Sequence, residues 1–250
     1  VLVVVPHNAE EAAKIVELAH ENNIKVISYD RLITKSNLDY YISFDNEKVG
    51  VLQATEIVKN TSKGKFAYIG GAETDNNAIL FRKGAMSVLQ PLIDKGDITL
   101  IADQYTDGWD PKVAEQNMKE ALKKSSNQVD AVVAANDGTA GGVISALGAV
   151  GLAGKIPVSG QDAELNGIKR IVEGTQTMTV YKPINVIATQ AAEMAFKVAK
   201  GENPKTDTTI NNNKIEVPTI LLEPTAVTKE TIDSTVVKDG YLAKEDIYGK

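Results

Sequence analysis

The sequence predicts an α/β fold in which parallel sheets carry helices on both faces. Short apolar runs alternate with segments of helical period, and the links between them are short. Uninterrupted runs such as Val1–Val5 and Ala131–Ala135 are typical of strands buried on both faces of a parallel sheet. Several of the predicted strands end in polar residues. The alternation leaves two arrangements open: one wide sheet, or two smaller doubly wound sheets that face each other across a cleft.

The charge balance excludes two classes of partner. The 250 residues allow one large domain or two smaller ones, and 43% of them are hydrophobic. Lysine and arginine number 27 against 33 acidic residues, which gives a formal charge of −6 without any basic run. The sequence therefore lacks the cluster of basic residues that binding to nucleic acid or to anionic lipid requires.

The residue types also limit the chemistry. There are no cysteines, so disulfides and thiolate zinc sites are excluded, and the chain is compatible with an oxidising compartment. The two histidines, His7 and His20, are interpreted as surface or packing residues. No phosphate-binding glycine motif occurs, and no apolar run approaches the roughly 20 residues that cross a bilayer. We expect no cofactor and no metal.

The first elements follow from local signals. Val1–Val5 predicts a buried strand that ends at Pro6. Asn8, with Glu11 three residues later, resembles a capping box at a helix start. The buried face of that helix is expected to comprise Ala12, Ile15, Val16 and Ala19.

The later elements follow the same two periodicities. Further strands are expected at Lys25–Tyr29, Tyr40–Phe44, Phe66–Ile69, Thr99–Ala102, Ala131–Ala135, Ile156–Ser159 and Met178–Tyr181. Helices are expected around Val51–Val58, up to Ile93, from Pro111 to Leu122, up to Leu147, over Ile168–Val172 and over Ile187–Val198. Signals then weaken to a turn at Asn211–Asn213 and short β-like runs at Ile220–Leu222 and Val236–Val237.

The stretch Gly70–Gly84 carries the first site signal. It lies between a predicted strand and a predicted helix, and it holds Glu73, Asp75, Asn76 and Asn77. Ligands bind at this edge of open α/β sheets. Carboxylates beside amides suit a neutral ligand with many hydroxyls better than a phosphate. The alternative is that Asp75 or Asn76 only caps the helix.

The same pattern recurs at other strand ends. The tips comprise Asp30-Arg31, Asp75-Asn76-Asn77, Trp109, Asn136-Asp137, Asp162 and Lys182. Capping explains an Asp or Asn after a strand but not an Arg, a Trp or a Lys. Trp109, the single tryptophan, is either a core plug or a flat face for a sugar ring. Paired carboxylates could also serve a glycosidase, but beside Arg and Lys they would be ionised and unsuited to a general acid.

Ordered motifs along the chain resemble one family. They are YDR (29–31), YYISFDNEKVG (40–50), GGAETDNNAILFRKG (70–84), DGWDP (107–111), AANDGTAGG (134–142), SGQDAELNGIKRI (159–171) and GTQTMTVYKPI (174–184). Together they resemble the bacterial D-xylose-binding proteins, which are solute receptors of sugar ABC transporters in the type I periplasmic-binding-protein family. The resemblance runs from Val1 to about Tyr241.

The resemblance implies two doubly wound domains that close on the sugar like a hinge. It places residues 1–46 and 183–217 in the first domain, and residues 47–182 and 218–250 in the second. Carried over residue by residue, it implies that the sugar contacts are Asp30, Arg31, Asp75, Asn77, Trp109, Asn136, Asp162 and Lys182.

One departure from the family pattern concerns the start of the chain. Family members begin with roughly two more strand–helix units, so Val1 corresponds to the third strand of the first sheet. Without those units, Val1–Val5 would expose a sheet edge and an apolar face. We therefore expect the first domain to be incomplete in this chain, and to be completed by an N-terminal segment or by a second chain.

The sequence thus predicts a non-enzymatic, extracytoplasmic receptor for a monosaccharide, with D-xylose as the leading candidate. The expected partner is a membrane ABC permease or a membrane histidine kinase. The alternative is the ligand-sensing core of a lactose-repressor-type regulator, which has the same fold. A glycosidase or sugar isomerase is the third hypothesis.

Overall fold

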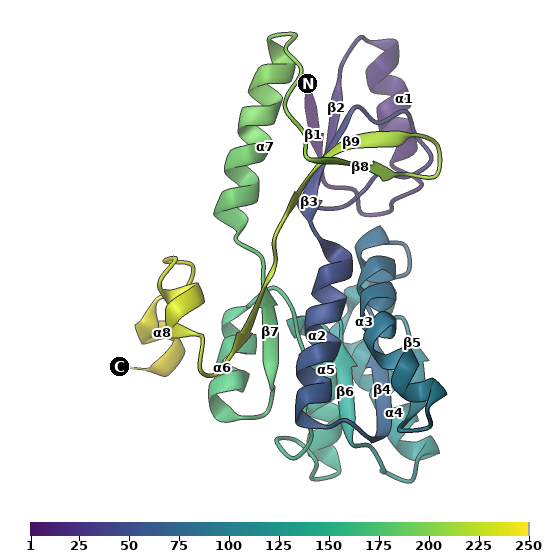
Figure 1. The fold of residues 1–250 in the computed structure, drawn as a ribbon, viewed down its shortest axis with the longest axis vertical. Helices are drawn as coiled ribbons and strands as arrows, with labels where there is room; N and C mark the ends of the chain where they lie inside the picture. The colour runs from purple at the N-terminus through teal and green to yellow at the C-terminus, as the bar shows by residue number, and fades with distance from the viewer. Residues whose placement is uncertain (250) are drawn as a thin grey trace. The chain divides into compact units, whose positions relative to one another are not determined.

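A computed structural model describes residues 1–249, and these form two compact units (Figure 1). Unit 1 comprises Val1–Asp45, Thr74–Asn77 and Pro183–Glu223. Unit 2 comprises Asn46–Glu73, Ala78–Lys182 and the chain from Pro224 on. Each unit has its own parallel sheet, which confirms the predicted fold class of two doubly wound sheets rather than one wide sheet.

The sheet of unit 1 has the strand order β1-β2-β3-β9-β8. The strands are β1 (Leu2–Val4), β2 (Val26–Tyr29), β3 (Tyr40–Phe44), β8 (Thr208–Asn211) and β9 (Glu216–Leu222). The first four in this order pair in parallel, and β8 joins β9 as an antiparallel hairpin. The predicted turn at Asn211–Asn213 makes this hairpin, and Asn212 Nδ2 anchors it by donating to the carbonyls of Ile33 and Ser36.

Helices cover both faces of this sheet. Helix α1 (Ala13–Glu21) places Val16 and Ala19 in a cluster with Val26 and Tyr41. Helix α7 (Ile184–Ala199) packs on the other set of strand residues. Its cluster contains Ile187, Ala191, Met194, Ile27, Ile42 and Phe44. Adjacent residues Val26 and Ile27 therefore face opposite layers, as the period-2 geometry of a strand requires.

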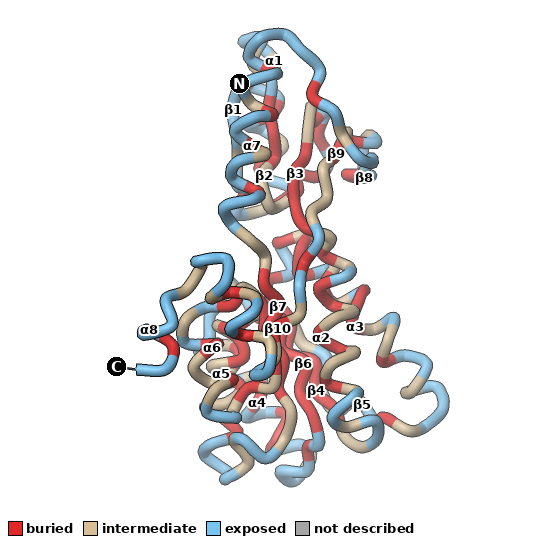
Figure 2. Tube along the Cα trace, turned by 60° about the vertical axis from the view of Figure 1, so that its left-hand side comes forward, coloured by how far each residue is buried: buried red, intermediate tan, exposed pale blue. Residues whose placement is uncertain are grey.

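The prediction from the local pattern that Val1–Val5 is buried is wrong, whereas the expectation that these residues expose a sheet edge and an apolar face is confirmed. Strand β1 spans only Leu2–Val4, and Val1, Leu2, Val3 and Val5 are all exposed, Val3 by 47%. Figure 2 shows this strand largely in the colour of exposed residues. The reason is its place in the sheet, because within residues 1–249 β1 lies at an edge and pairs with β2 alone. Ile15, predicted on the buried face of its helix, is also exposed.

The sheet of unit 2 has the order β5-β4-β6, formed by β4 (Gly64–Ile69), β5 (Ile98–Gln104) and β6 (Ala131–Ala134). A separate antiparallel pair joins β7 (Met178–Tyr181) to β10 (Thr225–Thr228). The predicted strand Ile156–Ser159 is reduced to a single bridge between Val158 and Val132. Pro157 has no N–H for a ladder, and the Ser159 hydroxyl instead contacts the Ala134 N–H and carbonyl at 3.0 Å each.

The helices of unit 2 cover both faces of its sheet. They are α2 (Asn46–Asn60), α3 (Asn76–Asp94), α4 (Pro111–Lys124), α5 (Asp137–Ala149), α6 (Leu165–Glu173) and α8 (Lys244–Tyr248). Met118 and Val143, from α4 and α5, pack with Val132, while Ile57 and Leu89, from α2 and α3, pack with Val133. The run Val236–Val237, predicted as β-like, instead ends the π-helical segment η2 (Asp233–Val237).

Two segments that the resemblance places in the second domain group with unit 1. β9 continues the sheet of unit 1 through Leu222 by pairing with β3, so Ile220–Leu222 belongs with unit 1. The short segment Thr74–Asn77 also groups with unit 1. That segment contains two predicted site residues, Asp75 and Asn77.

Candidate functional site

In unit 1, a guanidinium–carboxylate pair forms at the end of β2. Arg31 lies two residues after the end of this strand, and its Nε is 2.9 Å from Asp75 Oδ2. The Asp75 side chain is only 2% exposed, and its Oδ1 also accepts a hydrogen bond of 3.0 Å from the main-chain N–H of Asn77. Asp75 therefore caps the first turn of α3, which is one of the two roles considered from the sequence, and it also pairs with a strand-end cation.

Asp30 lies in the same cluster and has an unusual backbone. Its φ of 59° is in the left-handed region, which Asp tolerates better than most residues. Its carbonyl accepts hydrogen bonds from the hydroxyls of Tyr41 (3.0 Å) and Ser43 (2.6 Å) and from Asn77 Nδ2 (3.2 Å). Asn77 Nδ2 is also 3.5 Å from Asp30 Oδ2. The neighbouring strand β3 therefore fixes the turn that carries Asp30 and Arg31.

The unit 1 cluster has the composition of a hydroxyl-binding surface. Carboxylates at Asp30 and Asp75 accept hydrogen bonds, while Arg31 and Asn77 donate them. Hydrogen bonds to such charged groups contribute about 1.5–3 kcal/mol each, more than neutral ones. Sequence reasoning identified all four residues, and the structure brings them together.

In unit 2, Trp109 is held by a glycine and a phenylalanine. It ends the 3₁₀ turn η1 (Asp107–Trp109) with a φ of 59°. A Cβ added at Gly71 would lie 2.0 Å from the indole Cη2, so the ring packs directly on the Gly71 backbone. The Phe81 ring meets the indole edge-on, with centroids 6.3 Å apart and an interplanar angle of 69°. The indole is only partly buried and packs against the core cluster that contains Phe81.

Lys182 and Asp162 form an ion pair in the same unit. Lys182 follows β7, and its Nζ is 3.4 Å from Asp162 Oδ1 and 5.9 Å from the centre of the Phe81 ring. The Lys182 side chain is 11% exposed, against 37% for Asp162. Asp162 has a φ of 93°, and its N–H donates to the carbonyl of Val180 in β7. Phe81 therefore connects Lys182 to Trp109.

Asn136 divides its amide between two roles. It is the N-cap of α5, where its Oδ1 accepts from the Thr139 N–H at 2.8 Å and Thr139 Oγ1 accepts from the Asn136 N–H at 3.0 Å. This capping box uses the side-chain oxygen only. Within the part of the chain that the structure describes, no protein acceptor takes the Nδ2 protons. Those protons are suited to a ligand hydroxyl.

Sequence reasoning missed three residues that support the predicted site residues of unit 2. Phe81 is buried in α3, and neither Phe81 nor Gly71 has a polar side chain that would mark it as a site residue. Asp137 was noticed beside Asn136 but not selected, although its side chain is completely buried and burial raises its pKa to about 7. The signal that could have found Asp137 is an acid placed directly after an apolar strand.

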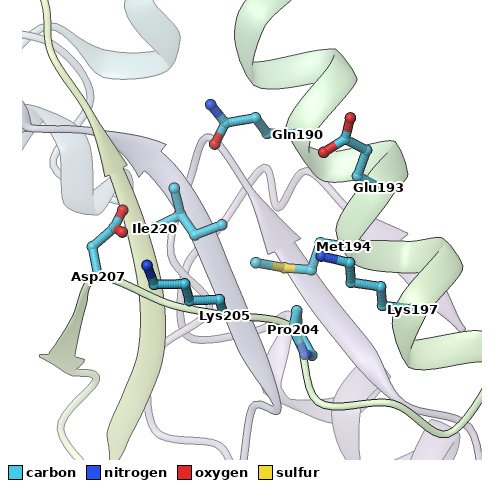
Figure 3. A pocket seen from close by; sticks show the side chains of 8 residues that line it. All are labelled: Gln190, Glu193, Met194, Lys197, Pro204, Lys205, Asp207 and Ile220. Carbon is cyan, nitrogen blue, oxygen red and sulfur yellow. The ribbon is translucent and has the colours of Figure 1, made fainter.

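Unit 1 also contains a hollow of about 420 Å³ beside α7, shown in Figure 3. It is lined by Gln190, Glu193, Met194, Lys197, Pro204, Lys205, Asp207 and Ile220. These side chains come from α7, from the segment that follows it and from β9. None of the eight predicted site residues lines this hollow, so it is a separate feature.

Metal binding and membrane crossing are two other kinds of function to consider. Among residues 1–249, no group of three or more His, Cys, Asp or Glu side chains could hold a metal ion. Over the same residues, no helix combines the length and the apolar character that crossing a membrane requires.

Comparisons with known proteins agree with this site chemistry. Residues 1–203 match the model of the family described as "Periplasmic binding protein domain". The chain is 51% identical over 247 residues to the D-xylose-binding periplasmic protein of Escherichia coli, and 52% identical over 248 residues to that of Haemophilus influenzae. Each match covers 99% of this chain and 75% of the relative.

Solved structures extend the likeness. A carbohydrate transporter solute-binding protein from Chloroflexus aurantiacus, in complex with D-glucose, superposes with a TM-score of 0.91 at 31% identity. The match covers 98% of this chain and 80% of that one.

Proposed function

Because this chain belongs to the periplasmic binding protein family, we propose that it is a receptor that binds D-xylose and delivers it to an ABC transporter permease. At the coarser level, the chain is an extracytoplasmic sugar-binding protein and not an enzyme. The identity of about half the residues with two D-xylose-binding relatives supports the choice of pentose.

The observation that carries this proposal is a cation–carboxylate pair in each unit at the end of a strand. Arg31 pairs with Asp75 in unit 1, and Lys182 pairs with Asp162 in unit 2. Each pair holds charged donors and acceptors in place without a ligand, which reduces the ordering cost of binding. Sugar hydroxyls are both donors and acceptors, so they match such pairs.

We assign each residue a role toward one bound sugar. Asp30, Asp75 and Asp162 accept hydrogen bonds from its hydroxyls. Arg31, Asn77, Asn136 and Lys182 donate hydrogen bonds to its oxygens. The Trp109 ring packs against the C–H face of the sugar, a contact that contributes on the order of 1–3 kcal/mol.

The two units act in this proposal as the two sugar-binding domains. The sugar bridges the first domain (1–46 and 183–217) and the second (47–182 and 218–250), and binding favours a closed form. The closed form is then recognised by a membrane permease. A membrane histidine kinase that recognises the same form is the second possible partner.

Calorimetric titration with xylose, arabinose, ribose and glucose tests the proposal. We expect xylose to bind stoichiometrically with a Kd of about 1 μM, equivalent to about −8 kcal/mol. Asp162→Ala is expected to weaken it by at least tenfold, because the hydroxyls and Lys182 lose a charged partner. Failure of all four sugars to bind, or conversion of xylose to a product, would contradict the proposal.

A further inference from the structure

Asp137 is a buried carboxylate at the start of α5 that the proposed sugar contacts do not use. Three groups donate hydrogen bonds to it. Gln176 Nε2 lies 2.6 Å from Oδ1, while the Glu164 N–H (2.9 Å) and the Thr179 hydroxyl (3.1 Å) both reach Oδ2. These donors come from β7, from the segment before it and from the loop before α6. Asp137 therefore connects three segments of unit 2 through one side chain.

The loop that Asp137 holds is the loop that carries Asp162. Asp162 and Ala163 both have positive φ, at 93° and 53°. Such backbone conformations cost on the order of 1–3 kcal/mol for residues other than glycine, and persist only when the surroundings enforce them. Two hydrogen bonds hold this backbone in place. The Glu164 N–H donates to the Asp137 carboxylate, and the Ala163 N–H donates to the Thr179 hydroxyl oxygen at 3.2 Å.

The packing around Asp137 leaves no room for a different arrangement. A Cβ added at Gly160 would lie 2.0 Å from Asp137 Oδ1, and one added at Gly167 would lie 2.3 Å from Oδ2. Arg170 closes the cluster by donating to the Asp137 carbonyl at 2.6 Å and to Gln176 Oε1 at 3.0 Å. The Gln176 amide is thus oriented with its NH₂ group toward the carboxylate.

We propose that Asp137 is a positioning residue for sugar binding, which holds the loop from Gly160 to Glu164 so that Asp162 stays beside Lys182. This inference rests on the proposed function, because it assigns Asp137 an effect only through Asp162. It adds a determinant of sugar affinity that does not touch the sugar. The Thr179 hydroxyl completes the same arrangement by linking Asp137 to the Ala163 N–H.

The near-isosteric variant Asp137→Asn tests the proposal most directly. The amide oxygen of the asparagine can still accept the hydrogen bond from Gln176 Nε2. Its NH₂ group then faces the Glu164 N–H, which is also a donor, so the hydrogen bond from Glu164 is lost. We expect xylose affinity to fall at least tenfold and the Glu164 amide to exchange hydrogen faster. Asp130→Asn is the matched control, since Asp130 Oδ2 accepts from the Lys65 N–H at 2.7 Å beside the amino end of β6. Its xylose affinity should stay within twofold of wild type.

A second pair of variants covers the case in which Asp137→Asn does not fold. Thr179→Val removes the hydroxyl, and it is expected to weaken xylose binding three- to tenfold. Thr179→Ser retains the hydroxyl and should restore the affinity to within twofold of wild type. Equal affinity of the Val and Ser variants with wild type would overturn the proposal.

The double variant with Asp162→Ala separates this inference from the proposed function. If Asp137 acts through Asp162, Asp137→Asn has no further effect on affinity in that background. If Asp137→Asn reduces xylose affinity by the same factor in wild type and in Asp162→Ala, the inference is overturned but the proposed function is not. The same holds if Asp137→Asn binds xylose with wild-type affinity while Asp162→Ala binds it weakly. Wild-type affinity of Asp162→Ala, or no xylose binding by the wild-type protein, overturns the assigned site and the inference together.

Discussion

Asp75 Oδ2 accepts from Arg31 Nε at 2.9 Å, while the other oxygen of the same carboxylate caps the first turn of α3. One buried side chain therefore links the end of β2 to the start of a helix. Loss of the charge and loss of the cap are different events, and they can be separated by substitution.

Two substitutions of Asp75 should divide these effects. Asp75→Asn keeps an oxygen for the cap but removes the charge that Arg31 pairs with, so we expect xylose affinity to fall at least tenfold with α3 intact. Asp75→Ala removes both and should lower the free energy of unfolding by about a further 1 kcal/mol, the usual contribution of a cap. Calorimetric titration and urea unfolding measure the two quantities. Equal stability of the two variants would show that the cap contributes nothing.

Gly71→Ala should displace the indole of Trp109. The added Cβ would lie 2.0 Å from Cη2, far inside contact distance, so the ring must move. We expect a red-shifted tryptophan emission and weaker xylose binding by tenfold or more. Gly148→Ala is the control, because its nearest heavy atom, Ala153 Cβ, lies at 4.0 Å and the position is within α5. That variant should keep the emission and gain up to about 1 kcal/mol of stability. Unchanged emission of Gly71→Ala would contradict the packing.

Lys182→Met should weaken xylose binding without unfolding the protein. The substitution keeps the apolar stem over Phe81 but removes the ammonium that pairs with Asp162. Lys244→Met is the matched control. Lys244 also pairs with an aspartate, Asp233, and its Nζ lies 5.6 Å from the centre of the Tyr248 ring. We expect at least a tenfold loss of affinity for the first variant and less than twofold for the second. Similar affinities for both would remove Lys182 from the site.

The pH dependence of stability should reveal the buried carboxylate of Asp137. Burial raises its pKa from 3.8 to about 7 in the folded state. Between these values the folded protein holds a proton that the unfolded chain has released, so the contribution of Asp137 to stability falls as the pH rises. Among residues 1–249, the titratable or charged residues that interact with Asp137 include Asp162, Glu164 through its main-chain N–H, Arg170 and Tyr241.

Comparison of wild type with Asp137→Asn isolates this effect from the other titrations. From pH 4 to pH 8, wild type should lose up to about 4 kcal/mol of unfolding free energy relative to the variant, since one pKa unit is equivalent to about 1.4 kcal/mol. Chemical unfolding at four pH values measures the difference. Parallel stability profiles would show that Asp137 has an ordinary pKa.

The fold followed from the sequence wherever hydrophobic period and strand pairing agree. Ala131–Ala134 and Met178–Tyr181 form strands because their apolar runs meet neighbours that can pair with them. Val1–Val5 has an equally apolar run, but β1 occupies a sheet edge, and burial depends on neighbours that a local pattern does not contain. The strand predicted at Ile156–Ser159 does not form for a local reason, because Pro157 has no N–H to donate to the hydrogen bonds between strands.

The candidate site divides along the same line. Asp30, Arg31, Asp75 and Asn77 were identified as polar tips, and the structure brings these four into one cluster. Phe81, Gly71 and Asp137 act by supporting other side chains, and such roles depend on distances that spacing along the chain does not give.

The left-handed backbone at Asp30, Trp109 and Asp162 has a consequence for attempts to change the sugar preference of this protein. Valine, isoleucine and threonine are strongly disfavoured in that conformation, whereas asparagine, aspartate and glycine adopt it with less strain. In a library that is randomised at these three positions, only a few residue types would therefore be compatible with folding. Selection for new ligands would then favour changes at Asn77, Asn136 and Lys182, which are not among the residues with positive φ.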